Sequence, residues 1–269
     1  TGASGAGKST ALYREIIDRS MAEPDRNFLV IVPDQFTMQT QMDLVRMHPR
    51  KGIMNIDVVS FSRLSHRVME EVGQDGRTIL DDTGKSLVLR RIAGKCKDQT
   101  TVIGGSLDKT GYIHEVKSAI SEFMQYGIGP EELDALTEYA RKRGGLYHKL
   151  KDLGVLYREF RAYTQEKFVT TEETLEMLAR RLPQSELVRH CVAAVDGFTG
   201  FTPVQNRVLQ TLMGLADEVI VSVTLGDGED MRETGEEQGL FHLSKKTIGT
   251  LTRLAEEAGV SRGRDVGLP

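Results

Sequence analysis

The sequence predicts an α/β protein in which a parallel β-sheet domain with a phosphate-binding loop is interrupted by a helical insertion. The loop pattern is TGASGAGKST at residues 1–10. Strand, loop and helix patterns alternate over residues 1–71 and return after about residue 185, whereas the residues between them show helical spacing. Strands that alternate with helices favour a parallel sheet with helices on its faces.

The first ten residues match a P-loop. Gly2, Gly7, Lys8 and Ser9 complete the pattern G-x-x-x-x-G-K-[ST]. Its glycines allow backbone shapes that other residues avoid, so that several N–H groups can point at phosphate oxygens. Lys8 is expected to reach the β- and γ-phosphates and the Ser9 hydroxyl to bind Mg²⁺, while the following helix adds its positive end. We therefore predict a site for ATP and Mg²⁺ at Gly2, Ala3, Ser4, Gly5, Ala6, Gly7, Lys8, Ser9 and Thr10. The alternative is a glycine-rich turn before a helix.

A P-loop ordinarily follows a β-strand. The printed sequence begins inside the loop and has no initial Met, so we expect it to be a fragment of a longer chain. An apolar strand before Thr1 would complete the context of the loop.

The elements up to residue 80 alternate between helix and strand. The expected ranges are a helix at 8–22, a strand at 28–32, a helix ending near 47, a strand at 56–59 and a helix ending near 71. Ligands of such sheets bind at the carboxyl ends of the strands. Gln35 follows the first of these strands and is therefore predicted to lie near the nucleotide or a nucleic acid, with an ordinary polar loop residue as the alternative.

Two interpretations are open for the segment that follows the strand at 56–59. Ser60, Phe61 and Arg63 could contact DNA through a hydroxyl, a stacking ring and a guanidinium group. Alternatively, Ser60 is the N-cap of a helix and Phe61 belongs to the core.

The middle of the chain is predicted to be a helical subdomain. Helices are expected at 81–96, 111–126, 130–142 and 145–168, with no strand among them. Their apolar stripes are typical of a helix-bundle core. We therefore predict a discontinuous sheet domain at 1–80 and 186–260, a helical insertion at 81–185 and an unstructured tail at 261–269.

The sheet pattern resumes with an apolar strand at 191–195, then a helix at 204–215, a strand at 218–223 and a helix at 241–258. Asp196 directly follows the first of these strands, where a carboxylate would support Mg²⁺ opposite Ser9; a turn-capping Asp is the alternative. Motor ATPases of the helicase type place a Glu at the next position, where it activates water. Here that residue is Gly197, which cannot act as a base, so that nucleotide binding is better supported than hydrolysis.

Composition and charge narrow the functional classes to which the chain could belong. The 269 residues carry a net charge of −4, without a global basic signature for nucleic acid. The basic clusters Arg90–Arg91 and Arg141–Arg143 are interpreted as solvated helix faces. The two cysteines have no ligand spacing, which disfavours a zinc site or disulfide framework and fits a cytoplasmic protein. No apolar run is long enough for a membrane span.

Five motifs together resemble the N-terminal part of the AddB (RexB) family, the B subunits of bacterial AddAB ATP-dependent helicase–exonucleases. They are GASGAGKS at 2–9, IVPDQFTMQ at 31–39, VVSFSRL at 58–64, HEVKSAISEF at 114–123 and VDGFTGFTPVQ at 195–205. The similarity extends to about residue 258.

The resemblance implies a RecA-like, superfamily-1 helicase-type fold with a helical insertion. It also implies a role in processing double-strand breaks for recombinational repair, with an AddA-type helicase/nuclease subunit as partner and double-stranded DNA ends and single-stranded DNA as substrates. In this family the iron–sulfur cluster belongs to a C-terminal region outside this sequence, so the expected cofactors here are ATP and Mg²⁺. By position, residues 2–10 would hold phosphates, Gln35 would lie between nucleotide and DNA, Phe61 and Arg63 would line the DNA side, and Asp196 would face Mg²⁺.

Two hypotheses follow. The chain is an ATP-binding region of a helicase/nuclease subunit that lacks nuclease and motor activity by itself, or it is a non-hydrolysing scaffold with a vestigial P-loop that docks the partner and DNA. A small-molecule P-loop kinase is disfavoured by the long helical insertion.

Overall fold

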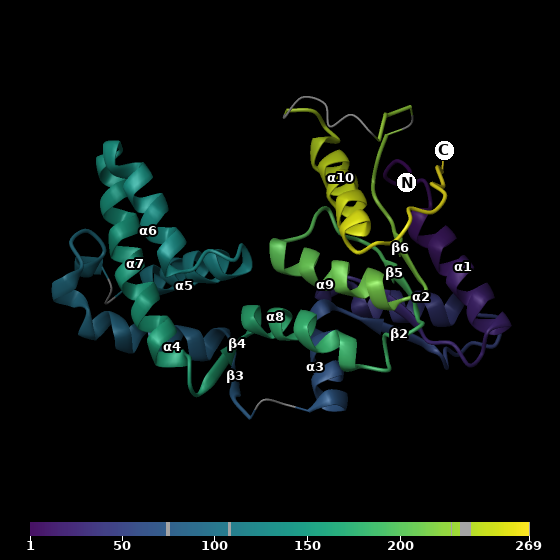
Figure 1. The fold of residues 1–269 in the computed structure, drawn as a ribbon, viewed down its shortest axis with the longest axis horizontal. Coiled ribbons are helices and arrows are strands. Elements are labelled where there is room, and N and C mark those ends of the chain that lie inside the picture. Colours follow the sequence, from purple (N-terminus) through teal and green to yellow (C-terminus); the bar gives the residue numbers. More distant parts are fainter. Residues whose placement is uncertain (74–75, 107–108, 227, 232–237, 269) are drawn as a thin grey trace. The chain divides into compact units, whose positions relative to one another are not determined.

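The structure is a computed structural model that describes residues 1–73, 76–106, 109–226, 228–231 and 238–268 (Figure 1). Its contacts divide the chain into two compact units, which are described separately. The sheet unit comprises residues 1–73 and 175–269, and the helical unit comprises residues 74–174. The sequence-based boundaries are 80/81 and 185/186.

The sheet unit contains four parallel strands in the order β2-β1-β5-β6. The strands are β1 (Phe28–Ile31), β2 (Ile56–Val59), β5 (Val192–Val195) and β6 (Glu218–Val221). The helices of this unit are α1 (Lys8–Ala22), α2 (Thr37–Met47), α3 (Phe61–Val72), α9 (Pro203–Leu215) and α10 (His242–Glu257), and α8 (Thr171–Arg181) enters it from the helical unit. The parallel sheet of the prediction is therefore confirmed.

Alternate residues of the central strands face opposite sides of this sheet. Leu29 and Ile31 belong to one buried cluster, together with apolar side chains of α3, α8, α9 and α10. Phe28 and Val30 belong to another, together with residues of α1 and α2. This period of two arises because successive side chains of a strand point to opposite faces. Helices thus cover both faces of the sheet.

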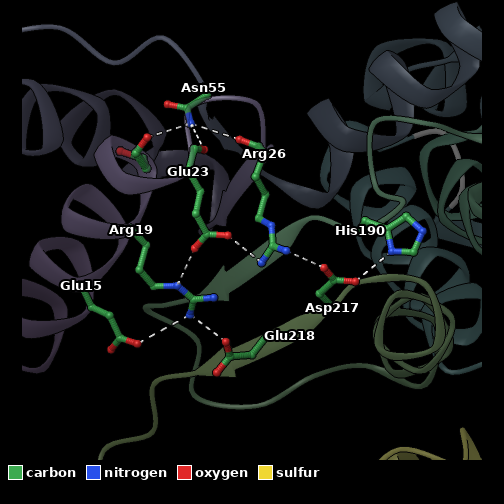
Figure 2. Close-up of polar contacts among 9 residues, drawn as sticks. Glu15, Arg19, Glu23, Arg26, Asn55, His190, Asp217 and Glu218 are labelled. Carbon is green, nitrogen blue, oxygen red and sulfur yellow. Dashed lines mark hydrogen bonds and ion pairs between the residues drawn. The ribbon is translucent and has the colours of Figure 1, made fainter.

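The amino edge of the sheet is occupied by a chain of ion pairs (Figure 2). Arg19 of α1 contacts Glu218 at 2.7 Å, and Arg26, which precedes β1, contacts Asp217 at 2.9 Å. The remaining members are Glu15, Glu23 and His190, each within ion-pair distance of one of these residues. Each exposed pair contributes about 0–1 kcal/mol. The charges of this edge are therefore largely satisfied by one another.

Asn55 adds a polar anchor beside this network (Figure 2). Its Nδ2 atom lies within hydrogen-bond distance of the carbonyl oxygens of Ser20, Glu23 and Arg26, at 3.1, 3.2 and 3.1 Å. These carbonyls lie at the end of α1 and in the turn after it, where backbone acceptors lack helical partners. Asn55 therefore fixes the connection from α1 to β1.

The helical unit consists of α4 (Asp82–Lys95), α5 (Thr110–Gln125), α6 (Pro130–Tyr139) and α7 (Gly144–Thr164), together with two short parallel strands, β3 (Thr78–Leu80) and β4 (Phe168–Thr170). Five 3₁₀ turns occur in the described part of the chain, at Asp34–Phe36, Lys97–Gln99, Gly104–Ser106, Ala140–Lys142 (η4) and Leu182–Gln184. The prediction of helix through residue 168 is wrong, because α7 ends at Thr164 and Phe168 pairs with Thr78.

The tail also differs in part from its prediction. Residues 261–268 form no helix or extended strand, but Leu268 makes a parallel bridge with Gly2. Arg262 and Asp265 form an ion pair at 2.8 Å. Residue 269 lies outside the described residues. Among the helices that the structure describes, none combines the length and apolar character needed to cross a membrane.

Candidate functional site

The predicted phosphate-binding loop lies at the carboxyl edge of the sheet. Gly2 forms a parallel bridge with Thr224, three residues beyond the end of β6, and its carbonyl accepts a hydrogen bond from the Leu225 N–H at 3.0 Å. The loop then leads into α1, which begins at Lys8. Asp196 immediately follows β5 and therefore lies at the same edge. Ligands of parallel sheets bind at this edge.

The glycines of the loop have two different roles. Gly5 and Gly7 have φ angles of 84° and 79°, in the left-handed region that side-chain-bearing residues avoid. Gly2 does not use this freedom, which corrects the prediction that all three glycines do. A Cβ atom at Gly2 would lie 3.0 Å from the Leu268 carbonyl oxygen. Glycine is needed there because the two backbones approach closely.

The start of α1 offers unoccupied donors. Gly7 is its N-cap and provides no side-chain acceptor, and the first turn contains no acidic residue. The first N–H groups of a helix have no intrahelical partner and favour an anion. The Lys8 ammonium donates to the Ala3 carbonyl at 2.7 Å, so this side chain lies back over the loop. Ser9 and Thr10 are exposed.

Asp196 is held by hydroxyl groups. The Tyr13 hydroxyl donates to Asp196 Oδ2 at 2.9 Å, and the Ser222 hydroxyl donates to Asp196 Oδ1. Asp196 is only 4% exposed. Burial, with a contribution from the neighbouring Asp196 carboxylate, raises the pKa of Tyr13 well above its usual value, so the phenol remains a donor. Among the described residues, Ser9 forms no hydrogen bond with Asp196.

These residues fit phosphate groups better than a directly bound metal ion. The loop backbone, the start of α1 and Lys8 all present donors or positive charge. Asp196 already accepts two hydrogen bonds, although each carboxylate oxygen has room for another, including one from a magnesium-bound water. Within the part of the chain that the structure describes, no group of three or more His, Cys, Asp or Glu could hold a metal ion.

Tyr13 and Ser222 were not identified as site residues from the sequence. Tyr13 lies on the buried face of α1 with Leu12, Ile16 and Ile17, where its spacing indicates a core residue. Only the fold places its hydroxyl against a residue 183 positions later. No sequence signal links Ser222, which follows β6, to the carboxylate.

Gly197 has a backbone conformation that bears on the missing catalytic glutamate. Its φ is 79°, and a Cβ atom there would lie 3.4 Å from Pro33 Cδ. A glutamate at this position would be strained in the present backbone. The local backbone, as well as the sequence, therefore disfavours a catalytic glutamate directly after Asp196.

The structure distinguishes the other predicted site residues. Gln35 is exposed in the 3₁₀ turn after β1, at the same sheet edge as the loop. Ser60 accepts a hydrogen bond from the Arg63 N–H at 3.2 Å and caps α3. Phe61 is 4% exposed and packs edge-on against Phe198.

Ser60 is therefore the N-cap and Phe61 a core residue, as the second interpretation has it, and the structure does not favour the predicted DNA contacts of these two side chains. A buried ring has no free face on which a base could stack, and Ser60 is 1% exposed with its hydroxyl oxygen used by the helix. Arg63 is exposed on the first turn of α3 and stays a predicted DNA contact.

Replacing Tyr13 with Phe is expected to lower the free energy of unfolding of the sheet unit by about 1.5–3 kcal/mol, because a buried carboxylate loses one donor. Urea unfolding followed by circular dichroism measures the change. Tyr139→Phe is the matched control, since Tyr139 is 86% exposed. Equal midpoints for both variants would show that the Tyr13–Asp196 hydrogen bond contributes nothing.

Comparison with known proteins shows the family to which the chain belongs. Residues 1–267 match the family model described as ADDB, N-terminal. Relatives named as the B subunit of ATP-dependent helicase/deoxyribonuclease include proteins of Lachnoclostridium phytofermentans, 42% identical over 94% of this chain, and Moorella thermoacetica, 34% identical over 99%. A protein of the same name from Bacillus pumilus is 31% identical over 96% of the chain. The chain spans only 22%, 24% and 22% of the lengths of these relatives, respectively. On the match over nearly its whole length, the chain belongs to the AddB N-terminal family.

Proposed function

We propose that this chain is the RecA-like, ATP-binding N-terminal region of the B subunit of an ATP-dependent helicase/deoxyribonuclease. One observation carries the proposal: the loop of residues 2–10 lies at the carboxyl edge of a parallel sheet, with two left-handed glycines before a helix that begins at Lys8. The relatives' name supports a role on DNA and, because it specifies one subunit among others, an assembly with a second, AddA-type subunit. By itself the chain would have neither nuclease nor motor activity.

In this proposal each site residue has a defined task. The N–H groups of the loop bind the β- and γ-phosphates, and the Lys8 ammonium moves from the Ala3 carbonyl to a phosphate oxygen. Ser9 binds the Mg²⁺ that accompanies ATP, and Asp196 holds a water of that ion. Gln35 lies between the nucleotide and DNA. Mg²⁺ neutralises phosphate charge when it is bound.

The alternative is a scaffold that has kept the loop without its ligand. Its support is that Tyr13 and Ser222 occupy both oxygens of Asp196 and that Gly197 replaces the catalytic base. Both hypotheses predict little ATP hydrolysis, so nucleotide binding must separate them.

Titration calorimetry with ATP and Mg²⁺ tests the proposal on this chain and on the full-length protein. Lys8→Ala is expected to weaken binding by about 100-fold or more, since it removes the charge that pairs with the phosphates. Lys246→Ala, an exposed lysine on α10, is the matched control and should bind like the wild type. If the wild type binds no nucleotide, or if Lys8→Ala binds equally well, the scaffold hypothesis replaces the first.

A further inference from the structure

The helical unit carries a strongly basic segment, residues 139–151, which we call the basic turn. It contains five Lys or Arg residues and no Asp or Glu: Arg141, Lys142, Arg143, Lys149 and Lys151. The rest of the chain then has 35 − 5 = 30 Lys and Arg residues against 39 Asp and Glu residues. The basic turn is therefore a locally positive stretch within a chain whose remaining residues carry a net negative charge.

The structure presents this segment to solvent. It comprises the last residue of α6, the 3₁₀ turn η4 and the first residues of α7, at one end of the α6–α7 helix pair (Figure 1). All five cationic side chains are exposed. Arg141 lies 3.4 Å from Glu138, and both side chains are largely exposed. Among the described residues, the other four cations have no ion-pair partner.

The backbone of the basic turn is accessible as well. A Cβ atom added at Gly144 or Gly145 would meet no atom within 4 Å. The first turn of α7 contains no acidic residue, and Arg143 at its N-cap provides no side-chain acceptor. Helix N-termini often accompany Arg and Lys side chains in contacts with nucleic-acid phosphates. The exposed cations and the backbone N–H groups at the start of α7 thus favour the same kind of ligand, an anion such as a phosphate group.

A solvated helix face, the interpretation made from sequence, explains this segment less well. Surfaces that only confer solubility intersperse charges of both signs, whereas this segment has one sign. The same end of the helix pair also exposes apolar side chains. Leu136, Tyr139 and Leu146 are 45%, 86% and 43% exposed. Cations next to exposed apolar groups are typical of a binding surface.

We propose that the basic turn binds the phosphate backbone of duplex DNA. A duplex carries one negative charge per about 1.7 Å, which suits several exposed cations on a short turn. Proteins that bind single strands stack successive bases on aromatic rings, chiefly Phe, Tyr and Trp, and within residues 139–151 Tyr139 is the one exposed side chain of these three types. The choice of DNA as the polyanion rests on the proposed function, whereas the cationic surface does not.

Charge reversal on the intact chain tests this inference. The variant Arg141→Glu/Lys142→Glu/Arg143→Glu is compared with the wild type by fluorescence anisotropy on a labelled duplex of about 30 base pairs, at about 50 to 200 mM salt. We expect at least about 10-fold weaker binding of the duplex. The slope of log K against log salt should become shallower by about 2 to 3, because three phosphate contacts are lost. The matched control is Arg46→Glu/Arg50→Glu/Lys51→Glu, which makes the same change in net charge on exposed residues of the sheet unit.

Each other outcome overturns the inference. If the control variant loses as much DNA affinity as the basic-turn variant, the effect comes from net charge. If the basic-turn variant binds DNA as tightly as the wild type, the basic turn takes no part in DNA binding. A loss seen only with single-stranded DNA would replace the duplex as ligand. If the variant loses its binding to the partner subunit while its DNA affinity is unchanged, the turn is instead a docking surface for an acidic protein. Nucleotide titration of Lys8→Ala stays independent, because no residue of the basic turn belongs to the loop of residues 2–10.

Discussion

Lys85→Met is expected to lower the free energy of unfolding of the helical unit by about 3–5 kcal/mol, because it leaves a buried carboxylate unpaired. The Lys85 side chain is 3% exposed, and its ammonium lies 2.8 Å from Oε1 of Glu172, whose side chain is 6% exposed. It also contacts Ser121 Oγ at 3.1 Å and Asp82 Oδ1 at 2.9 Å. Burial lowers the pKa of Lys85, but the hydrogen bonds and charges of Glu172 and Asp82 outweigh burial and raise it. The lysine is therefore charged at neutral pH.

The environment of Glu172 makes this loss severe. Within the described part of the chain, its Oε2 atom is buried without a hydrogen-bond partner, so that Lys85 provides the main compensation for the carboxylate. Chemical unfolding measured by circular dichroism gives the change in free energy.

Two further variants separate the buried pair from ordinary charge effects. Lys85→Met/Glu172→Leu should recover most of the lost stability, because replacing both partners of a buried pair by apolar residues is often neutral. Arg158→Met removes an exposed pair with Asp134 and should cost about 1 kcal/mol or less. A Lys85 effect no larger than that of Arg158→Met would contradict the interpretation.

Asp152→Asn is expected to lower the free energy of unfolding by about 2–4 kcal/mol, because a hydrogen bond to a charged acceptor contributes about 1.5–3 kcal/mol and asparagine keeps one acceptor oxygen. Asp152 is 1% exposed on α7. Its carboxylate accepts hydrogen bonds from the backbone N–H groups of Thr101, Val102 and Ile103, at distances from 2.7 to 3.0 Å. The side-chain amide of the introduced asparagine would direct N–H groups at these donors.

Hydrogen exchange gives a local measurement of this loss. The amides of residues 101–103 should be protected in the wild type and exchange much faster in the variant. Glu159→Gln, an exposed substitution on the same helix, is the control and should leave these amides unchanged. Equal protection in Asp152→Asn would show that other contacts hold the segment.

Much of the fold could be predicted from the sequence, because its longer elements repeat a pattern over several turns. The buried face of α1 at Leu12, Tyr13, Ile16 and Ile17 follows helical spacing. The strands β3 and β4 have three residues each, too few to show a period, and their stability comes from pairing with each other. The hydrogen bonds of the Asp152 carboxylate could not be predicted, because its partners lie about 50 positions away in the sequence.

The site was predictable only to the extent that it is local in sequence. Residues 2–10 form one contiguous pattern, and Asp196 directly follows an apolar strand. The hydroxyl groups around Asp196 come from α1 and from the segment after β6, so the folded chain alone brings them together. The choice between a core and a DNA-binding role for Phe61 likewise depended on contacts with Phe198 and Phe201, which follow β5.

The order of the strands has a consequence for synthesis of the protein. In the sheet, β1 pairs with β5, and Phe28 is opposite Val192, so the whole helical unit is made between the two partners. At about 5–20 residues per second, β1 waits on the order of 10–30 s on the ribosome for that neighbour. Near the ends of the helical unit, Thr78 is paired with Phe168. Once the unit has folded, these strands shorten the loop that the sheet must close, which reduces its entropic cost. Early folding of the helical unit therefore favours the pairing of β5 with the open edge of β1 once β5 has been made.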